Sequence, residues 1–273
     1  MPWAGRPQAF LRPLVPGSAA IGSGPALNQT AGMDAPSAPT VARPVMLHEW
    51  STVTFLHWPY RPPVVQRMLP RGLEVESVDG QAWVGLVPFR MRDVRIPGVP
   101  AVPWLSRFPE TNVRTYVRGP DGQSAIWFFS LDAARLPAVL AARTTYWLRY
   151  FWADMGVVED GRRVRYDSRR RWPGPSGAGC RALVEVGDPY RVDELGELDH
   201  FLTARYVLYA SVAGRLVYAH AEHPPWPLAR ARAVDVAEDL IEAAGLPAPQ
   251  GRPLVHHSAG VRVRIGAWKP VRT

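Results

Sequence analysis

Residues 108–117, FPETNVRTYV, carry four side chains suited to acid/base chemistry and anion binding at every second position. Side chains alternate between the two faces of a strand, so one face would present Glu110, Asn112, Arg114 and Tyr116. A buried carboxyl group exchanges protons near neutral pH, and a guanidinium group binds a carboxylate through two hydrogen bonds. We interpret Glu110 as a candidate general acid or base and the other three as candidate substrate-binding residues.

The next segment decides whether this polar face points into the protein or into solvent. Residues 124–131, SAIWFFSL, are almost wholly apolar, which is typical of a strand buried on both faces. A hairpin partner of such a strand is expected to be central in its sheet, and the polar row would then line an interior pocket. A solvent-facing edge strand, which needs no function, remains the alternative.

A second candidate set lies in residues 141–151, AARTTYWLRYF. Arg143 and Tyr146 are three positions apart and share a face of the predicted helix, while Tyr150 begins the next strand. Arg143 could hold a carboxylate, and the two phenols could donate to a developing enolate oxygen. Alternatively, the apolar residues here, including Trp147, are core and the tyrosines only pack with their hydroxyls at the surface.

Residues 218–228, YAHAEHPPWPL, contain two histidines and a glutamate, but their spacing does not suit a metal site. His220 and Glu222 share one strand face and His223 does not, and the helical spacing of a zinc protease motif is absent. We predict no metal and place His223 at the rim of the pocket. Glycine-rich phosphate loops, a nucleophile elbow and paired cysteines are also missing, which disfavours nucleotide hydrolysis and serine hydrolase chemistry.

Composition narrows the classes of protein further. The net charge of +8 permits contact with nucleic acid or an acidic membrane, but the one dense arginine run, at 161–172, reads as a solvated hairpin, and we expect neither a nucleic-acid nor a membrane partner. No uncharged apolar run reaches 18 residues, so we expect no membrane span. The single cysteine, Cys180, fits a reducing cytoplasm. The sequence is compatible with a homo-oligomer.

The elements that must position these residues begin after a long tail. Residues 1–45 are rich in Pro, Gly, Ala and Ser and predict a disordered tail, followed by a single domain over 46–273. Hairpins are predicted at Asp79-Gly80 and at 119–122, and helices at 62–71, 133–145, 193–206 and 228–245. Mostly antiparallel strands with a few surrounding helices indicate an α+β fold, with a closed or half-closed β barrel.

Five segments in this order resemble the YqjF-like family of bacterial proteins, over about residues 46 to 268: FPETNVRTYVRGPDG with IWFFSLDA, ARTTYWLRYFWADM, FLTARYVLY, HPPWPL and LVHHSAGVRV. That family is placed in the acetoacetate decarboxylase-like superfamily. The resemblance implies a cone-like antiparallel β barrel with the active site in a funnel. It places Glu110 at the pocket glutamate, and no basic residue near Val53 matches the superfamily's pocket arginine.

In true acetoacetate decarboxylases a helix-to-strand segment carries two adjacent lysines, and the first forms a Schiff base with the substrate. The resemblance places Arg143 at the arginine of that segment, Arg149 at its proline, and Tyr150 and Phe151 at the two lysines. A phenol cannot form an iminium, and Lys269, which is the chain's only lysine, lies four residues from the C-terminus. We therefore predict that this chain is not a true acetoacetate decarboxylase.

Two functions remain at this stage, and neither requires a cofactor. The first is an enzyme that acts on a small carbonyl or carboxylate compound by acid/base chemistry of the aldol, dehydration or cyclisation type. The second is a non-catalytic protein that binds a small molecule in the same funnel, against Trp127, Phe129, Trp147 and Trp152.

Overall fold

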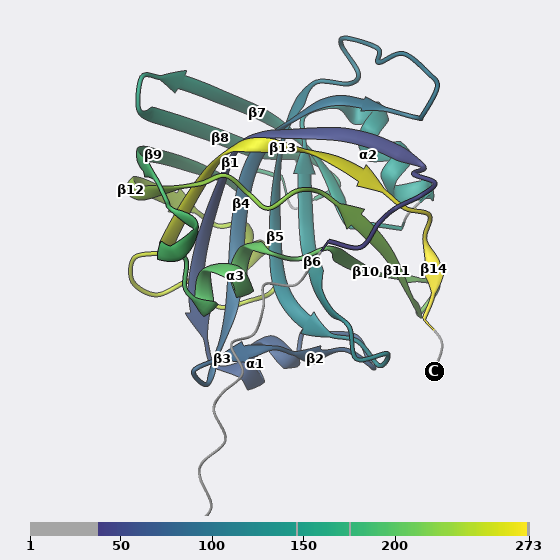
Figure 1. The fold of residues 1–273 in the computed structure, drawn as a ribbon, viewed down its shortest axis with the longest axis horizontal. Helices are drawn as coiled ribbons and strands as arrows, with labels where there is room; N and C mark the ends of the chain where they lie inside the picture. The colour runs from purple at the N-terminus through teal and green to yellow at the C-terminus, as the bar shows by residue number, and fades with distance from the viewer. Residues whose placement is uncertain (1–37, 146, 175, 272–273) are drawn as a thin grey trace, which may run out of the picture. The chain divides into compact units, whose positions relative to one another are not determined.

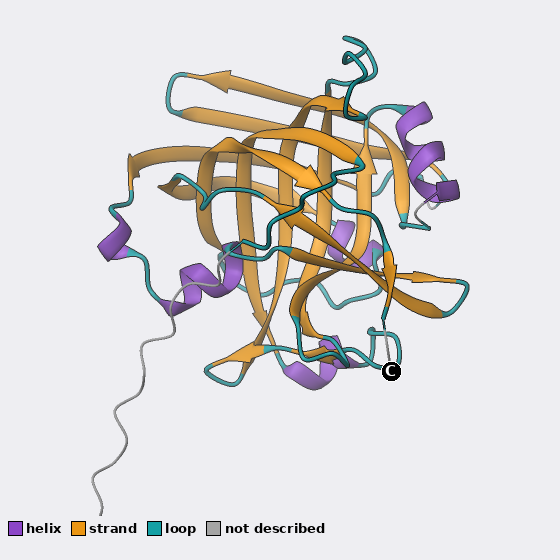
Figure 2. Ribbon diagram, turned by 45° about the vertical axis from the view of Figure 1, so that its right-hand side comes forward, coloured by secondary structure: helices purple, strands orange, loops and turns teal. Residues whose placement is uncertain are grey.

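The computed structural model describes residues 38–145, 147–174 and 176–271 (Figure 1). In this part of the chain, fourteen strands form one sheet, and the four α-helices are short (Figure 2). The predicted α+β class is confirmed. Most of the predicted disordered tail, residues 1–37, lies outside the described residues. No helix of the described part is long and apolar enough to cross a membrane.

The helices are short: α1 (Pro62–Gln66), α2 (Leu136–Thr145), the 3-10 helix η1 (Val192–Glu194), α3 (Glu197–Thr203) and α4 (Leu240–Ala243). The strands are β1 (Met46–Tyr60), β2 (Glu74–Val75), β3 (Ser77–Val78), β4 (Gln81–Arg95), β5 (Phe108–Arg118), β6 (Ser124–Ala133), β7 (Tyr150–Asp160), β8 (Arg163–Trp172), β9 (Gly179–Pro189), β10 (Val207–Val212), β11 (Arg215–Glu222), β12 (Leu228–Glu238), β13 (Leu254–Ile265) and β14 (Lys269–Pro270).

Strand pairing closes the main part of the sheet on itself. Neighbouring strands follow the order β6, β7, β8, β9, β12, β13, β1, β4, β5, and β5 pairs again with β6. Most pairs are antiparallel, as predicted, but β6 pairs in parallel with both β7 and β10. Strands β10 and β11 then continue from β6 back to β13. β5, which carries the candidate site, is thus central, with β4 on one side and β6 on the other.

Two predicted hairpins form because their turns contain residues that tolerate a positive φ. Asp79 and Gly80 have φ of 51° and 73° between β3 and β4, which is the backbone that a two-residue hairpin requires. Gly122 has φ of 77° between β5 and β6. The β5–β6 hairpin therefore lies where the sequence predicts it.

The predicted helix over residues 228–245 is wrong for most of its length. Residues 228–238, LARARAVDVAE, form strand β12, which pairs with β9 and β13, and only Leu240–Ala243 are helical. Alanine and arginine both favour helices, but the segment also alternates small or apolar residues with charged ones, which suits a strand with one exposed face. Pairing with two neighbouring strands outweighs the local helix preference.

Contacts with the sheet begin a few residues before the predicted domain start at residue 46. The amide of Val41 donates to the carboxylate of Glu222 at 2.6 Å, and the amide of Val45 donates to the carbonyl of Ile265 at 2.8 Å. The Val41 side chain is buried. Residues 41–45 therefore pack with the domain that follows them.

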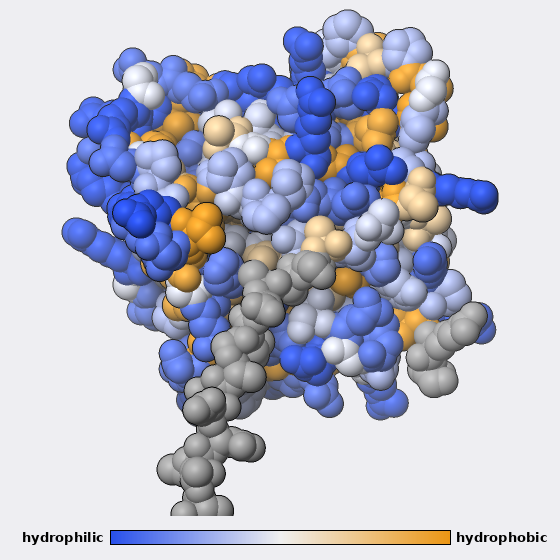
Figure 3. Space-filling model, in the orientation of Figure 1, coloured by the Kyte–Doolittle hydropathy of each residue, from blue (hydrophilic) through white to orange (hydrophobic). Residues whose placement is uncertain are grey.

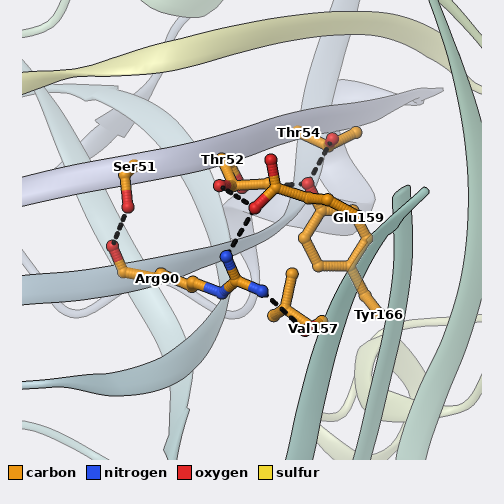
Figure 4. A network of polar contacts seen from close by, with 7 residues as sticks. All are labelled: Ser51, Thr52, Thr54, Arg90, Val157, Glu159 and Tyr166. Carbon is orange, nitrogen blue, oxygen red and sulfur yellow. Dashed lines mark hydrogen bonds and ion pairs between the residues drawn. The ribbon is translucent and has the colours of Figure 1, made fainter. Parts of the chain in front are cut away.

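A polar network holds β1 where its pairing with β4 is interrupted, between Ser51 and Leu56. Glu159 on β7 pairs with Arg90 at 2.5 Å and accepts a hydrogen bond from Thr52 at 3.1 Å (Figure 4). Tyr166 on β8 donates to the Thr52 carbonyl at 2.9 Å. The network joins four strands, and the segment of β1 that follows it supplies Val53 and Phe55 to a cavity wall.

Candidate functional site

A cavity of about 490 Å³ lies between the central strands, α2 and the ends of β1 and β13. Its walls are mainly apolar and include Trp50, Val53, Phe55, Val87, Phe89, Met91, Phe108, Ile126, Phe128, Leu131, Leu208 and Trp226. Its polar side chains include Glu110, Asn112, Arg114, Tyr150, Thr203, Arg205 and His223. A mostly apolar pocket with a few convergent polar groups is the usual form of a small-molecule site.

Strand β5 positions the first three polar groups. Glu110 lies opposite Phe89 and Ala133, Asn112 lies opposite Val87 and Leu131, and Arg114 lies opposite Gly85 and Phe128. A Cβ atom at Gly85 would approach the His57 ring to 2.8 Å, so glycine leaves room there for His57, which packs beside the stem of Arg114. The intervening residue Val113 packs into the core on the other face. Alternation along β5 therefore sends Glu110, Asn112 and Arg114 into the cavity.

Glu110 and Tyr150 form a buried pair. The Tyr150 hydroxyl donates to Oε2 of Glu110 at 3.0 Å, and Glu110 is only 3% exposed. Burial raises the pKa of Glu110 to about 8, against the opposing effect of the Tyr150 hydrogen bond, and the nearby Asp132 raises it further. Burial and the adjacent Glu110 also raise the pKa of Tyr150 well above its usual value. Both groups are protonated at neutral pH, so Glu110 can give up a proton and Tyr150 acts as a hydrogen-bond donor.

The raised pKa of Glu110 predicts a pH dependence of stability. Between pH 4.5, the ordinary glutamate pKa, and about 8, the folded protein keeps a proton that the unfolded chain releases. The free energy of unfolding should therefore fall as pH rises through this window, relative to Glu110→Gln, by on the order of a few kcal/mol. Urea unfolding of both proteins from pH 5 to 9 measures the difference, and a difference that stays constant with pH would contradict the assignment.

Asn112 and Arg114 present polar atoms without protein partners. The Asn112 Oδ1 and the Arg114 Nε are buried and make no hydrogen bond in the described structure. The Nη2 atom of Arg114 donates to the Tyr116 hydroxyl at 3.2 Å and to the Leu202 carbonyl at 3.1 Å, and the guanidinium lies over the Phe55 ring. Among the described residues no ion pair is formed by Arg114, whereas Arg205 in the same cavity pairs with Glu76. Buried polar groups usually have partners, so these two atoms indicate a place for a ligand.

Tyr116 does not line the cavity, although it shares the strand face of Arg114. Its ring is covered by Phe201 of α3, and its hydroxyl lies 2.5 Å from Nε2 of His57 and donates to the Leu202 carbonyl at 2.6 Å. The prediction that Tyr116 contacts a substrate is therefore corrected, because helix α3 closes the cavity before the strand reaches this residue. Tyr116 instead holds Arg114 in place.

Two residues of the 141–151 segment also point away from the cavity, and a third is not described. Arg143 donates to the Tyr150 carbonyl at 2.7 Å and lies over Trp172, so it supports the backbone of Tyr150 and does not reach a ligand. Trp147 is 56% exposed, because α2 ends at Thr145 and the backbone turns with φ of 54° at Trp147. Tyr146 lies outside the described residues. Tyr150 is the member of this predicted set that lines the cavity.

His223 lines the cavity as predicted for a rim residue, packed against Tyr206 and Trp226 at ring distances of 4.7 and 5.0 Å. Its Nδ1 donates to the Pro224 carbonyl at 2.8 Å, and burial lowers its pKa, so the ring is neutral. In the described part of the chain no three His, Cys, Asp or Glu side chains come together as a metal site.

Several residues that line the cavity were not predicted from the sequence. Ile126 and Phe128 face the cavity with Leu131, while the predicted aromatic wall of Trp127, Phe129 and Trp152 does not line it. A bulge in β6 opposite Val113 and Arg114 shifts the alternation by one residue, so a strict period of two fails along this strand. Thr203 ends α3 and Arg205 follows it, and only the folded chain shows that this helix packs beside β5.

Phe151 and Arg170 belong to a buried group behind the cavity. Arg170 lies in the arginine run predicted to be solvated, but its side chain is fully buried and pairs with Asp132 at 2.8 Å. Its guanidinium also lies 3.8 Å from the centre of the Phe151 ring. The solvated-hairpin prediction is therefore wrong at Arg170, since β8 turns this side chain inward against β6 and β7.

The fold is that of the acetoacetate decarboxylase-like proteins. The enduracididine biosynthesis enzyme MppR complexed with pyruvate superposes with a TM-score of 0.58 at 14% identity, covering 83% of this chain and 90% of that one. The acetoacetate decarboxylase from Legionella pneumophila subsp. pneumophila str. Philadelphia 1 superposes with a TM-score of 0.57 at 12% identity, covering 88% and 93%. These similarities confirm the fold expected from the sequence.

Within that fold the chain belongs to the DUF2071 family, described as "Uncharacterized conserved protein (COG2071)", whose model matches residues 48–262. It is 36% identical over 214 residues to "Uncharacterized protein YqjF" of Bacillus subtilis (strain 168), covering 78% of this chain and 87% of that protein. The predicted membership of the YqjF-like family is therefore confirmed.

Proposed function

We propose that this chain is an enzyme that binds a small apolar compound carrying a carboxylate and a carbonyl group and moves a proton with Glu110. The reaction would be of the aldol, dehydration or cyclisation type and would proceed without a Schiff base. One observation carries the proposal: the protonated Glu110–Tyr150 pair lines the same cavity as Asn112 and Arg114, each of which has a buried polar atom without a protein partner.

Each group has a separate task in this proposal. Arg114 binds the carboxylate through its free Nε side, and Asn112 accepts a hydrogen bond from a neighbouring hydroxyl or hydrated group. Protonated Glu110 gives its proton to the carbonyl oxygen, and the carboxylate so formed takes a proton from the adjacent carbon, which leaves an enol and returns Glu110 to its protonated form. The Tyr150 hydroxyl donates a hydrogen bond to the same oxygen. Glu110 and Arg114 are four residues apart on one strand, so their Cα atoms are roughly 13 Å apart. Their long side chains reduce the distance between the carboxyl and guanidinium groups, so that one ligand can contact both.

The absence of an amine at the position of Tyr150 supports chemistry without an iminium. Tyr150 occupies the cavity wall where the resemblance places the reactive lysine, and Phe151 lies behind that wall over Arg170. Lys269 is exposed, on β14, and is not among the residues that line the cavity. The neighbour MppR is described in complex with pyruvate, a 2-oxo acid, which is compatible with the ligand chemistry proposed here.

A second candidate function is a carrier or sensor that only binds its ligand. The observation that favours it is the mainly apolar lining, because such a wall holds a ligand tightly without contributing to a reaction. The two functions differ in the need for the proton of Glu110, because only an enzyme requires it.

Replacing Arg114 tests the proposed orientation of the ligand. A panel of 2-oxo and 3-oxo acids and their methyl esters would first be screened for compounds that raise the melting temperature of the protein. For such an acid, Arg114→Met should raise the Kd by about 10- to 150-fold, because a charged hydrogen bond is lost, and the ester should bind both proteins alike. The exposed Arg71→Met is the matched control. Equal weakening of acid and ester would contradict the role of Arg114.

A further inference from the structure

Exposed apolar side chains gather around the β4–β5 loop and α2. Six of the ten large apolar residues that are strongly exposed in the described chain lie there: Ile96, Val99, Val102, Trp104, Leu140 and Trp147. Figure 3 shows orange apolar atoms on the loop at the upper right, in the region where Figure 1 places this loop near α2. Scattered exposed apolar residues are ordinary, but a contiguous group usually marks an interaction surface.

Arginines are interspersed with these apolar residues along the chain. Residues 92–107 and 135–149 contain six arginines, Arg92, Arg95, Arg107, Arg135, Arg143 and Arg149, and one acid, Asp93, which pairs with Arg95. Arg135 donates from Nε to the Trp104 carbonyl at 2.9 Å, and its guanidinium lies over the Trp104 ring at 5.0 Å. The indole is thus held in an exposed position, 62% accessible, beside a cation.

The same loop and helix form part of the cavity wall. Ile96 and Leu105 from the loop, and Ala138, Ala141 and Ala142 from α2, all line the cavity. Because Ile96 is both 62% exposed and a lining residue, the apolar interior continues to the protein surface at this point. A partner that covers this surface would therefore lie at an opening of the cavity.

We propose that the surface formed by residues 92–107, 135–145 and 147–149 docks on an anionic lipid membrane, so that apolar ligands pass between the membrane and the cavity. Tryptophan and aliphatic side chains inserted beside arginines are the combination that peripheral proteins present to anionic lipid headgroups. A second copy of the chain fits less well, because the arginines would face each other across a symmetric contact. Nucleic acid fits less well because valine and isoleucine do not stack on bases.

Vesicle flotation tests this proposal with the full chain. Vesicles of phosphatidylcholine with 30 mol% phosphatidylglycerol should carry the wild-type protein at low salt, and vesicles of phosphatidylcholine alone should carry much less. The double variant Ile96→Ser/Trp104→Ser should lose at least about tenfold in partition, since both side chains leave the lipid. Arg92→Glu/Arg107→Glu should lose roughly 25-fold or more, at about fivefold for each arginine.

Exposed residues away from this surface supply the controls. Val192→Ser on η1 and Arg71→Glu after α1 change an exposed apolar residue and an exposed arginine in other elements, and these variants should bind as the wild type does. The proposal is overturned if the wild-type protein does not bind the anionic vesicles, or if the Ile96/Trp104 variant binds as well as the wild type. It is also overturned if that variant converts a dimer to a monomer in light scattering while vesicle binding is absent.

Discussion

Glu110→Gln is expected to lower the turnover of any substrate of this protein by about 10²- to 10⁴-fold, the usual contribution of a positioned general acid or base. Glutamine keeps the size of the side chain and still accepts the Tyr150 hydrogen bond, but it holds no exchangeable carboxyl proton. The rise in melting temperature caused by a bound ligand should therefore survive the change. Turnover and thermal stabilisation measured on the same samples separate the two effects.

The control for this prediction is Glu74→Gln, an exposed glutamate on β2 that should leave both quantities unchanged. If a compound stabilises the wild-type protein and Glu110→Gln equally, but neither protein converts it, the chain binds without catalysis. Equal turnover by Glu110→Gln and the wild type would remove Glu110 from the chemistry altogether.

Asp132→Ala is expected to lower the free energy of unfolding by about 3–5 kcal/mol, which is the loss found when one partner of a buried ion pair is removed. Both side chains of the Asp132–Arg170 pair are fully buried, and the Nε and Nη2 atoms of Arg170 bond the carboxylate at 2.8–3.0 Å. Without Asp132 the guanidinium stays charged in the core, because it does not lose its proton. Denaturant unfolding measures the loss.

Two further variants separate the pair from its surroundings. Asp132→Leu/Arg170→Met removes both charges and should recover most of the lost stability. Asp188→Ala removes one partner of the exposed Arg162–Asp188 pair and should cost less than about 1 kcal/mol. A loss at Asp132 as small as that at Asp188 would show that the buried pair does not support the wall behind the cavity.

The parts of the fold that local chemistry determines could be predicted from the sequence. Asp79-Gly80 tolerates the positive φ of a tight turn, and alternation along 108–117 sends Glu110, Asn112 and Arg114 to one face. The α+β class and the family also followed from these segments.

The parts that depend on distant contacts could not be predicted. Strand β12 forms because β9 and β13 lie on either side of it, and Arg170 is buried because Asp132 lies on a different strand. The bulge in β6 changes which aromatic residues face the cavity. Trp147 turns outward because α2 ends two residues earlier, which no periodicity indicates. The catalytic and binding roles of Glu110, Asn112, Arg114, Tyr150 and His223 stay predictions.

The central claim is that Glu110 moves a proton of a carbonyl compound without a covalent intermediate, and deuterium exchange tests it most directly. A 2-oxo or 3-oxo acid that stabilises the wild-type protein would be incubated with it in D₂O, with borohydride added to a parallel sample. We predict that the proton signal next to the carbonyl disappears faster than without protein, and that the intact mass of the borohydride-treated protein is unchanged. Exchange no faster than in buffer, or a reduced adduct on the protein, would contradict the claim.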